Sequence, residues 1–87
     1  MINNHDKEIE IIVNRFKNSD FDYVINKTSI LLKKIPNNDL LWNLKGLSLQ
    51  NLGNIKDSIS CFQMSLNNNQ KNIAARNNLG NSYKYAN

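Results

Sequence analysis

The sequence of 87 residues has few residues that interrupt regular secondary structure, with one proline and three glycines. Scarce proline and glycine favour long regular elements over β structure rich in turns. Cys61 is the single cysteine, which excludes an internal disulfide and fits a reducing compartment. No apolar run approaches the roughly 20 residues that a membrane-spanning helix needs, and the segment MINNHDKEIE lacks the basic start of a signal peptide. We therefore expect a cytoplasmic protein with no membrane partner.

Positive charge is in excess but is not clustered. The formal net charge is +4, and Lys33-Lys34 is the single adjacent pair of basic residues. A nucleic-acid surface requires a basic patch or stripe with partners that read bases, whereas dispersed lysines are typical of solvated helix faces. We expect no nucleic-acid partner, and nucleic-acid binding stays the weakest alternative.

Residue patterns that support catalysis or metal binding are missing. The sequence has one histidine, His5, and contains no Gly-rich phosphate loop, no Gly-x-Ser-x-Gly elbow and no spacing of metal ligands. Cys61 lies beside Phe62 without a neighbour that would lower its pKa, so a structural role is expected. We expect no intrinsic catalysis, no cofactor and no bound metal.

Apolar residues recur at helical spacing along the chain and make up 40% of the composition. Ile9, Ile12, Val13 and Phe16 follow the i, i+3, i+4, i+7 pattern of one helix face. Similar spacing recurs in later segments. The sequence predicts five helices, at approximately 6–17, 21–35, 40–52, 55–67 and 73–87.

Short polar segments that stop and restart helices separate these five segments. Pro36 ends the second helix, and Gly53 supplies the left-handed residue after the third. Asn18 is expected to take the same conformation after the first helix. The expected N-cap residues, which accept hydrogen bonds from the first turn of the following helix, are Asp20, Asp39, Asn54 and Asn72.

The five segments share a period of 34 residues. Pro36 corresponds to Gln70 in the connectors, and Gly46 corresponds to Gly80 in the first helix of each unit. The sequence therefore predicts one domain, residues 1–87, that contains repeats 5–38 and 39–72 and a partial repeat 73–87.

A helix–turn–helix unit of this length resembles the tetratricopeptide repeat. Leu79-Gly80 and Tyr83 in the third unit match the first helix of that family's pattern. In the central unit, the residues that carry the resemblance are Trp42, Gly46, Leu49, Ser58, Phe62 and Ser65. The resemblance implies an all-α fold, a right-handed α-solenoid of antiparallel helix pairs with about two and a half units and five helices. An unrelated helical bundle is the alternative.

Small residues predict where the helices of the central unit approach each other. Gly46 and Ser58 are expected to lie at a close crossing of the two helices, with Trp42 and Phe62 filling the space beside it. The expected packing residues of the fifth helix are Ile73, Ala75, Leu79, Gly80 and Tyr83.

The resemblance also implies a concave groove lined by the first helix of each repeat. This surface is rich in side-chain amides, which can donate to and accept from an extended peptide. The expected groove residues are Asn43, Leu47, Gln50, Asn77, Asn78, Asn81 and Lys84, with Leu40, Leu44, Asn51 and Ala74 on the same surface. We therefore expect a protein–protein interaction scaffold that binds a peptide or protein segment. Because asparagine is abundant throughout, the alternative is that the amides reflect composition.

Two further features leave the biological setting open. The segment LLKKIPNNDLLWNLKG, followed by NLGN, resembles N-terminal arrays of bacterial proteins that carry a glycosyltransferase or sulfotransferase domain. That resemblance implies an alternative function, a substrate-targeting arm of a larger transferase. The fifth helix has a partly apolar outer face, so we expect either a fragment of a longer array or association through this uncapped helix. The oligomeric state stays open.

Overall fold

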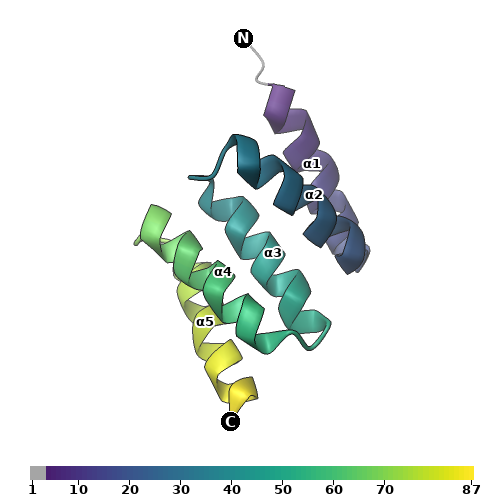
Figure 1. The fold of residues 1–87 in the computed structure, drawn as a ribbon. Coiled ribbons are helices and arrows are strands. Elements are labelled where there is room, and N and C mark those ends of the chain that lie inside the picture. The colour runs from purple at the N-terminus through teal and green to yellow at the C-terminus, as the bar shows by residue number, and fades with distance from the viewer. Residues whose placement is uncertain (1–3) are drawn as a thin grey trace.

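The computed structural model describes residues 4–87, which form five α-helices joined by short connectors (Figure 1). These residues contain no β-strand, so the expected all-α fold is confirmed. The helices are α1 (Asn4–Lys17), α2 (Phe21–Lys34), α3 (Asp39–Asn51), α4 (Ile55–Asn68) and α5 (Ile73–Ala86). No helix in the described range has the length and apolar character that crossing a bilayer requires.

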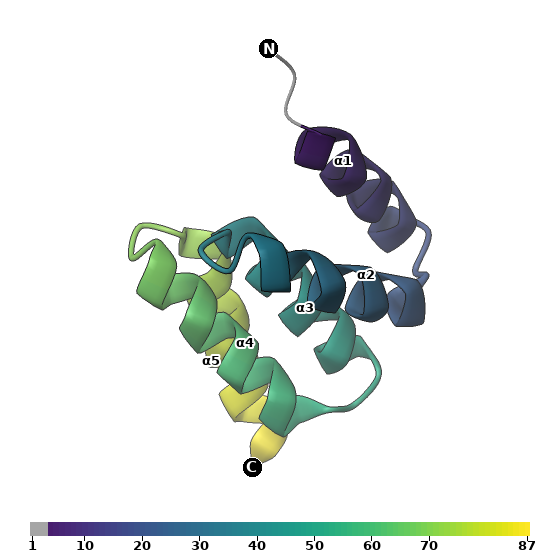
Figure 2. The same ribbon diagram turned by 45° about the horizontal axis from the view of Figure 1, so that its top comes forward.

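The helices pack in the order of the chain and form two layers. Each helix packs on the next, and α3 also contacts α1 and α5, whereas α2 and α4 do not contact each other. Figure 2 shows α1 and α2 at one end, α4 and α5 at the other, and α3 between them. This arrangement is an all-α helical repeat in which the odd-numbered helices form the more closely packed layer. The right-handed sense of the solenoid and its division into one domain with the stated repeats stay predictions.

The backbone conformation before α2 recurs before α4, one period later. Ser19 has a φ of 60° and Gly53 a φ of 86°. Gly53 therefore takes the left-handed conformation that the sequence predicts. The prediction for Asn18 is wrong, because the neighbouring Ser19 takes that conformation instead. Serine accepts it at a steric cost that glycine does not have.

The starts of α3 and α5 are capped in the same way. Asn38 Oδ1 accepts a hydrogen bond from the backbone N–H of Leu41, and Asn72 Oδ1 accepts one from Ala75, each at 2.9 Å. The predicted cap at Asn72 is therefore confirmed. The predicted cap at Asp39 is wrong by one residue, since Asn38 caps α3 and Asp39 is its first helical residue. Both residue types cap helices well, so the sequence alone does not separate them.

The other two predicted caps have the right position but not the expected hydrogen bond. Asp20 and Asn54 precede α2 and α4, and neither side chain accepts from its helix. The Asp20 carboxylate instead accepts from the Arg15 guanidinium at 3.1 Å. Asp39 Oδ2 also has another use: it accepts from Asn69 Nδ2 at 3.0 Å and from Asn72 Nδ2 at 2.8 Å. Asp39 thereby ties the start of α3 to the connector that precedes α5.

A side-chain N–H donates to a connector carbonyl at equivalent positions of two units, but the donor side chains differ. Trp42 Nε1 donates to the Pro36 carbonyl, and Arg76 Nη2 donates to the Gln70 carbonyl, both at 2.8 Å. Each donor lies one period from the other, and so does each acceptor. The backbone geometry of the repeat therefore selects a long side chain with an N–H at this position, aromatic in one unit and cationic in the next.

One apolar cluster joins α1, α2 and α3. Its buried residues are Ile12, Val24, Leu31, Leu32, Leu41 and Leu44. Trp42 and Ile35 are among the partly buried side chains that pack against it. Burying each large apolar side chain contributes roughly 1.5–3 kcal/mol, so this cluster accounts for the docking of the first unit on the second.

The Phe62 ring of α4 packs directly against Gly46 of α3. A Cβ atom at Gly46 would lie 2.6 Å from Phe62 Cε1, a separation that real Cβ atoms do not show. The three atoms nearest to that Cβ all belong to Phe62, which the sequence places beside the crossing. The predicted close approach of Gly46 and Ser58 stays a prediction. Ser58 is fully buried, and its hydroxyl faces α5 through Ser82 at 2.8 Å.

Positions equivalent to Gly46 and Phe62 carry the opposite sizes in the first unit. Ile12 stands one period before Gly46, and Thr28 stands one period before Phe62. Both are buried, at 2% and 0% exposure. A large residue on the first helix thus accompanies a small one on the second, and the reverse holds in the central unit. Close packing requires the combined volume to fit, not a particular residue at either position.

Helix α5 packs through small residues. Ala75 and Ser82 are fully buried and Leu79 is half-buried. Ile73, Gly80 and Tyr83, which the sequence analysis assigns to packing, are exposed. In the part of the chain that the structure describes, no helix covers Ile73 and Gly80, whereas the Tyr83 hydroxyl accepts a hydrogen bond from Gln63 Nε2 of α4 at 3.2 Å.

Replacing each glycine by alanine tests the close approach. In Gly46→Ala the added methyl meets the Phe62 ring, and overpacking of this kind costs about 1–3 kcal/mol, which outweighs a helix-propensity gain of about 1 kcal/mol. In Gly80→Ala the added methyl has no atom within 4 Å, so stability should rise by about 0.5–1 kcal/mol. Urea unfolding followed by circular dichroism measures both changes. Equal effects at the two glycines would contradict the assignment.

Candidate peptide-binding surface

The candidate site is the exposed surface of the odd-numbered helices, where the sequence places the groove. The seven predicted groove residues lie on α3 and α5. They divide into a group that is exposed or half-buried without a hydrogen bond to the neighbouring helix, and a group that joins α3 to α5. The first group is Leu47, Asn77, Asn81 and Lys84, and the second is Asn43, Gln50 and Asn78.

Two predicted groove asparagines bind each other. Asn78 Nδ2 donates to Asn43 Oδ1 at 3.0 Å, and Asn43 is 7% exposed. The Asn43 amide oxygen and one amide hydrogen of Asn78 are therefore bonded to each other between the two helices. Leu44, which the sequence analysis places on the same surface, belongs to the buried core at 6% exposure. The face that carries Asn43 and Leu44 is turned inward because neighbouring helices cover it.

Gln50 joins a buried polar network between three helices. Its Nε2 donates to Ser82 Oγ at 2.8 Å and to the Asn78 carbonyl at 3.3 Å. Ser82 Oγ and Ser58 Oγ share a hydrogen bond of 2.8 Å, and Ser58 Oγ donates to the Ile55 carbonyl at 2.6 Å. Buried hydroxyls are stable when they are paired in this way. The network fixes α5 against both α3 and α4.

Ser82 is the residue of this network that the sequence analysis missed. Ser48 stands one period earlier in α3, and both serines are fully buried. Recurrence of a serine at the same position of two units is the signal that could have found it. The Ser48 hydroxyl has no hydrogen-bond partner, and the counterpart of Ser58 in α2 is Val24. The same position is therefore polar and paired in one unit and polar but unpaired in the other.

Ser82→Ala and Ser48→Ala form a matched pair of tests. Ser82→Ala leaves the Gln50 amide without its side-chain acceptor in a part-buried site, which should cost about 1–3 kcal/mol of stability. Ser48→Ala removes a buried hydroxyl with no partner, so stability should stay the same or rise by about 1 kcal/mol at most. Both substitutions change helix propensity equally. Thermal and urea unfolding distinguish them, and a greater loss in Ser48→Ala would show that the network does not hold α5.

Comparison of equivalent positions shows which part of the odd-helix surface stays open in both units. Asn77 and Lys84 of α5 correspond to Asn43 and Gln50 of α3, which α5 covers. Three pairs of equivalent positions on α3 and α5 are not covered by a neighbouring helix in either unit. This open surface comprises Leu40, Leu47 and Asn51 of α3 and Ala74, Asn81 and Tyr85 of α5, all exposed except the half-buried Leu47.

The chemistry of the open surface suits an extended chain. Leu40 is 42% exposed and Tyr85 is 64% exposed, which gives apolar contact area on both helices. The Asn81 amide carries two donors and one acceptor, the groups that an extended peptide backbone requires. Asn51 Nδ2 is directed to the Leu47 carbonyl of its own helix at 2.8 Å, so its carbonyl oxygen is the group that it can offer.

A separate hollow of about 490 Å³ lies between α2, α3 and α4. Trp42, Leu49, Met64 and Cys61 contribute apolar surface to it, and Lys45 Nζ lies 5.6 Å from the centre of the Trp42 ring. Burial raises the pKa of the Cys61 thiol, against a smaller lowering by Lys45. The thiol is therefore neutral near pH 7, as a structural cysteine requires. Within residues 4–87, no cluster of three or more His, Cys, Asp or Glu side chains could hold a metal ion.

The chain is similar to part of a receptor. It is 31% identical over 80 residues to a peroxisomal targeting signal receptor of Candida glabrata. The match covers 90% of this chain and 14% of the receptor, so the chain spans about one seventh of the relative's length. No protein-family model matches the sequence. The five-helix array is consistent with a repeat of the tetratricopeptide type, and the similarity to a receptor fits a role in protein interaction.

Proposed function

We propose that this chain is a tetratricopeptide-type module that binds an extended segment of a partner protein across α3 and α5. The observation that carries the proposal is the open surface of the odd-numbered helices, which remains uncovered in both units. The same surface carries the apolar residues Leu40, Leu47 and Tyr85 and the exposed Asn81 amide. Backbone recognition by amides combined with apolar contacts gives affinity with a loose sequence preference.

The receptor relative supports the same reading. Its name describes a protein that receives a targeting signal, and a short segment of a cargo protein is the corresponding ligand class for this chain. We infer a partner of that kind, acting without catalysis by this chain and in the cytoplasm. The alternative of a substrate-targeting arm for a transferase gains no support from any contact in residues 4–87 or from the named relative.

The revised surface changes which residues a binding test should use. Asn78 is excluded, because its substitution would break the hydrogen bond to Asn43 that joins two helices. Asn81→Ala and Leu47→Ala are the informative variants. Asn67→Ala is the matched control for the first, because Asn67 is an exposed helical asparagine in the even-numbered layer, on α4.

The test uses peptides selected by phage display on the intact protein, followed by fluorescence anisotropy of the selected sequences. Loss of a hydrogen-bonding amide at the interface should weaken binding by about 1 kcal/mol, or roughly fivefold, in Asn81→Ala, and Leu47→Ala should weaken it by a similar factor. Asn67→Ala should bind as the parent does. If no peptide is enriched, or if Asn81→Ala and Leu47→Ala leave the affinity unchanged, the odd-helix surface is not the binding site. Circular dichroism of each variant verifies that the helices are intact.

A further inference from the structure

The uncovered face of α5 carries a second surface, distinct from the open surface of the odd-numbered helices. We call it the α5 edge and define it as Ile73, Arg76, Gly80 and Tyr83, which follow one another at helical spacing. Ile73 is 72% exposed and Tyr83 is 47% exposed. A Cβ atom at Gly80 would meet nothing within 4 Å. This face is therefore a shallow helix surface with a glycine at its centre and apolar side chains on both sides.

The equivalent face of α3 is an interface. One period before the α5 edge stand Asp39, Trp42, Gly46 and Leu49. The Phe62 ring of α4 lies directly on Gly46, and Leu49 is 7% exposed. Figure 1 shows α4 running alongside α3. The α5 edge thus repeats a face that binds a helix elsewhere in the molecule, and it retains the glycine that admits an aromatic ring.

The corresponding outer face of α1, at the opposite end of the array, is polar and has no exposed apolar side chains at these positions. In α3, Leu41, Leu44 and Ser48 are buried, and they belong to the face that the preceding helix covers. The equivalent residues of α1 are Lys7, Glu10 and Asn14, all exposed. Charged and amide side chains make this face unsuitable for burial, because each would have to give up its hydration. The face of α1 that corresponds to the covered face of α3 is therefore unsuited to receiving a helix, in contrast to the α5 edge.

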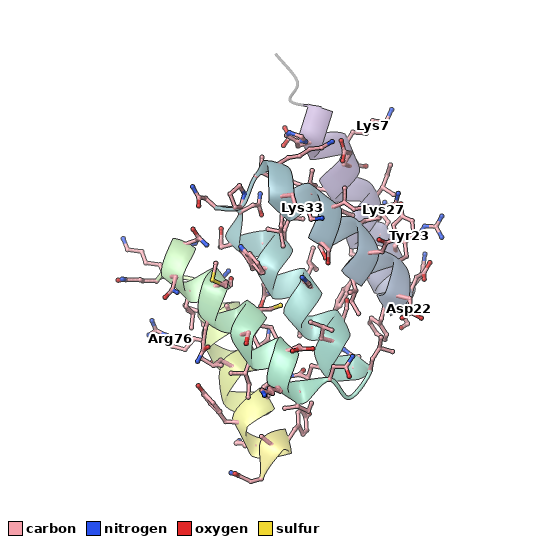
Figure 3. All side chains as sticks on the ribbon, viewed as in Figure 1. Lys7, Asp22, Tyr23, Lys27, Lys33 and Arg76 are labelled. Carbon is pink, nitrogen blue, oxygen red and sulfur yellow. The ribbon has the colours of Figure 1, made fainter. Side chains whose placement is uncertain are left out.

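The positive charge near the α5 edge determines which kind of helix can bind there. Residues 70–87 contain Lys71, Arg76 and Lys84 and no acidic residue. Arg76 is exposed, and Figure 3 shows its side chain extending away from the helices beside α4 and α5. A complementary partner therefore carries negative charge. Two α5 edges facing each other would instead bring like charges together, which disfavours a second copy of this chain as the occupant.

We propose that the α5 edge binds an acidic amphipathic helix of a partner protein, which presents an aromatic ring to Gly80. The ring occupies the place that Phe62 takes on Gly46, with Ile73 and Tyr83 on either side. The acidic side chains of the helix lie near Arg76 and Lys84. This interaction uses a surface different from the proposed peptide site, so the two can be occupied or abolished independently.

A constrained peptide tests the proposal. The probe is a synthetic copy of residues 55–68 with Lys56→Glu, which leaves two acidic residues and no basic one. Glutamate at position 63 and lysine at position 67 are condensed to a lactam, which fixes the helix and consumes both of their charges, since a free helix of this length is marginal in water. Circular dichroism verifies the helical state of the probe. Chemical shifts of the ¹⁵N-labelled full chain then report where it binds.

The expected result is a saturable set of shift changes centred on the amides of Ile73, Gly80 and Tyr83. Replacing the phenylalanine of the probe by alanine should weaken binding at least tenfold, and Gly80→Ala in the protein should do the same, because the added methyl meets the ring. Restoring the lysine in the probe should weaken binding severalfold, as should raising the salt concentration from 50 to 500 mM.

Four outcomes would overturn the proposal. The first is the absence of shift changes with a helical probe at millimolar concentration. The second is binding that does not depend on the aromatic ring or on Gly80. The third is concentration-dependent shifts at the α5 edge of the protein alone, which would make a second copy the occupant. Shift changes confined to Asn81 and Leu47 would count as binding at the other surface and against the α5 edge.

Discussion

The contact between Gly46 and the Phe62 ring sets how closely α3 and α4 approach, and the other interfaces are built around this hairpin. The ring fills the place that a side chain at Gly46 would occupy, so neither residue can change size alone. The first unit has Ile12 and Thr28 at these positions. The repeat therefore preserves a combined volume, and it preserves residue identity only where the backbone requires it.

Polar contacts add to the packing of Ala75 and Leu79 in attaching the last helix. The apolar cluster that includes Leu44 joins the first three helices. Helix α5 is also held by Ser82 bonded to Ser58 and Gln50 and by the pair formed by Asn43 and Asn78. Such bonds are directional and strong when buried, so they fix the position of α5 against α3 and α4. The same bonds decide which amides remain available to a ligand.

The helices and their order were predictable from the sequence, because apolar spacing and the turn at Gly53 act locally. Several details were not. The cap falls on Asn38 rather than Asp39, since either side chain can accept from the first turn. The Phe62 ring lies directly on Gly46 rather than only beside it, and Ser82 was missed. These outcomes depend on how one helix is rotated against another, which the spacing within a single helix does not encode.

The seven predicted groove residues also differ in how they are placed by helix packing. This difference separates the asparagines that hold the helices together from those whose amides are available to a partner. An asparagine whose amide is bonded to a neighbouring helix, as in Asn43, acts in assembly. An asparagine at a position that is open in both units, as in Asn81, is available for recognition. Asn77 is exposed here, yet its counterpart is covered, so its exposure depends on whether a helix lies beyond α5. The two proposed binding surfaces of α5 therefore lie on different faces: the open surface faces the same way in both units, and the α5 edge is the face that a further helix would occupy.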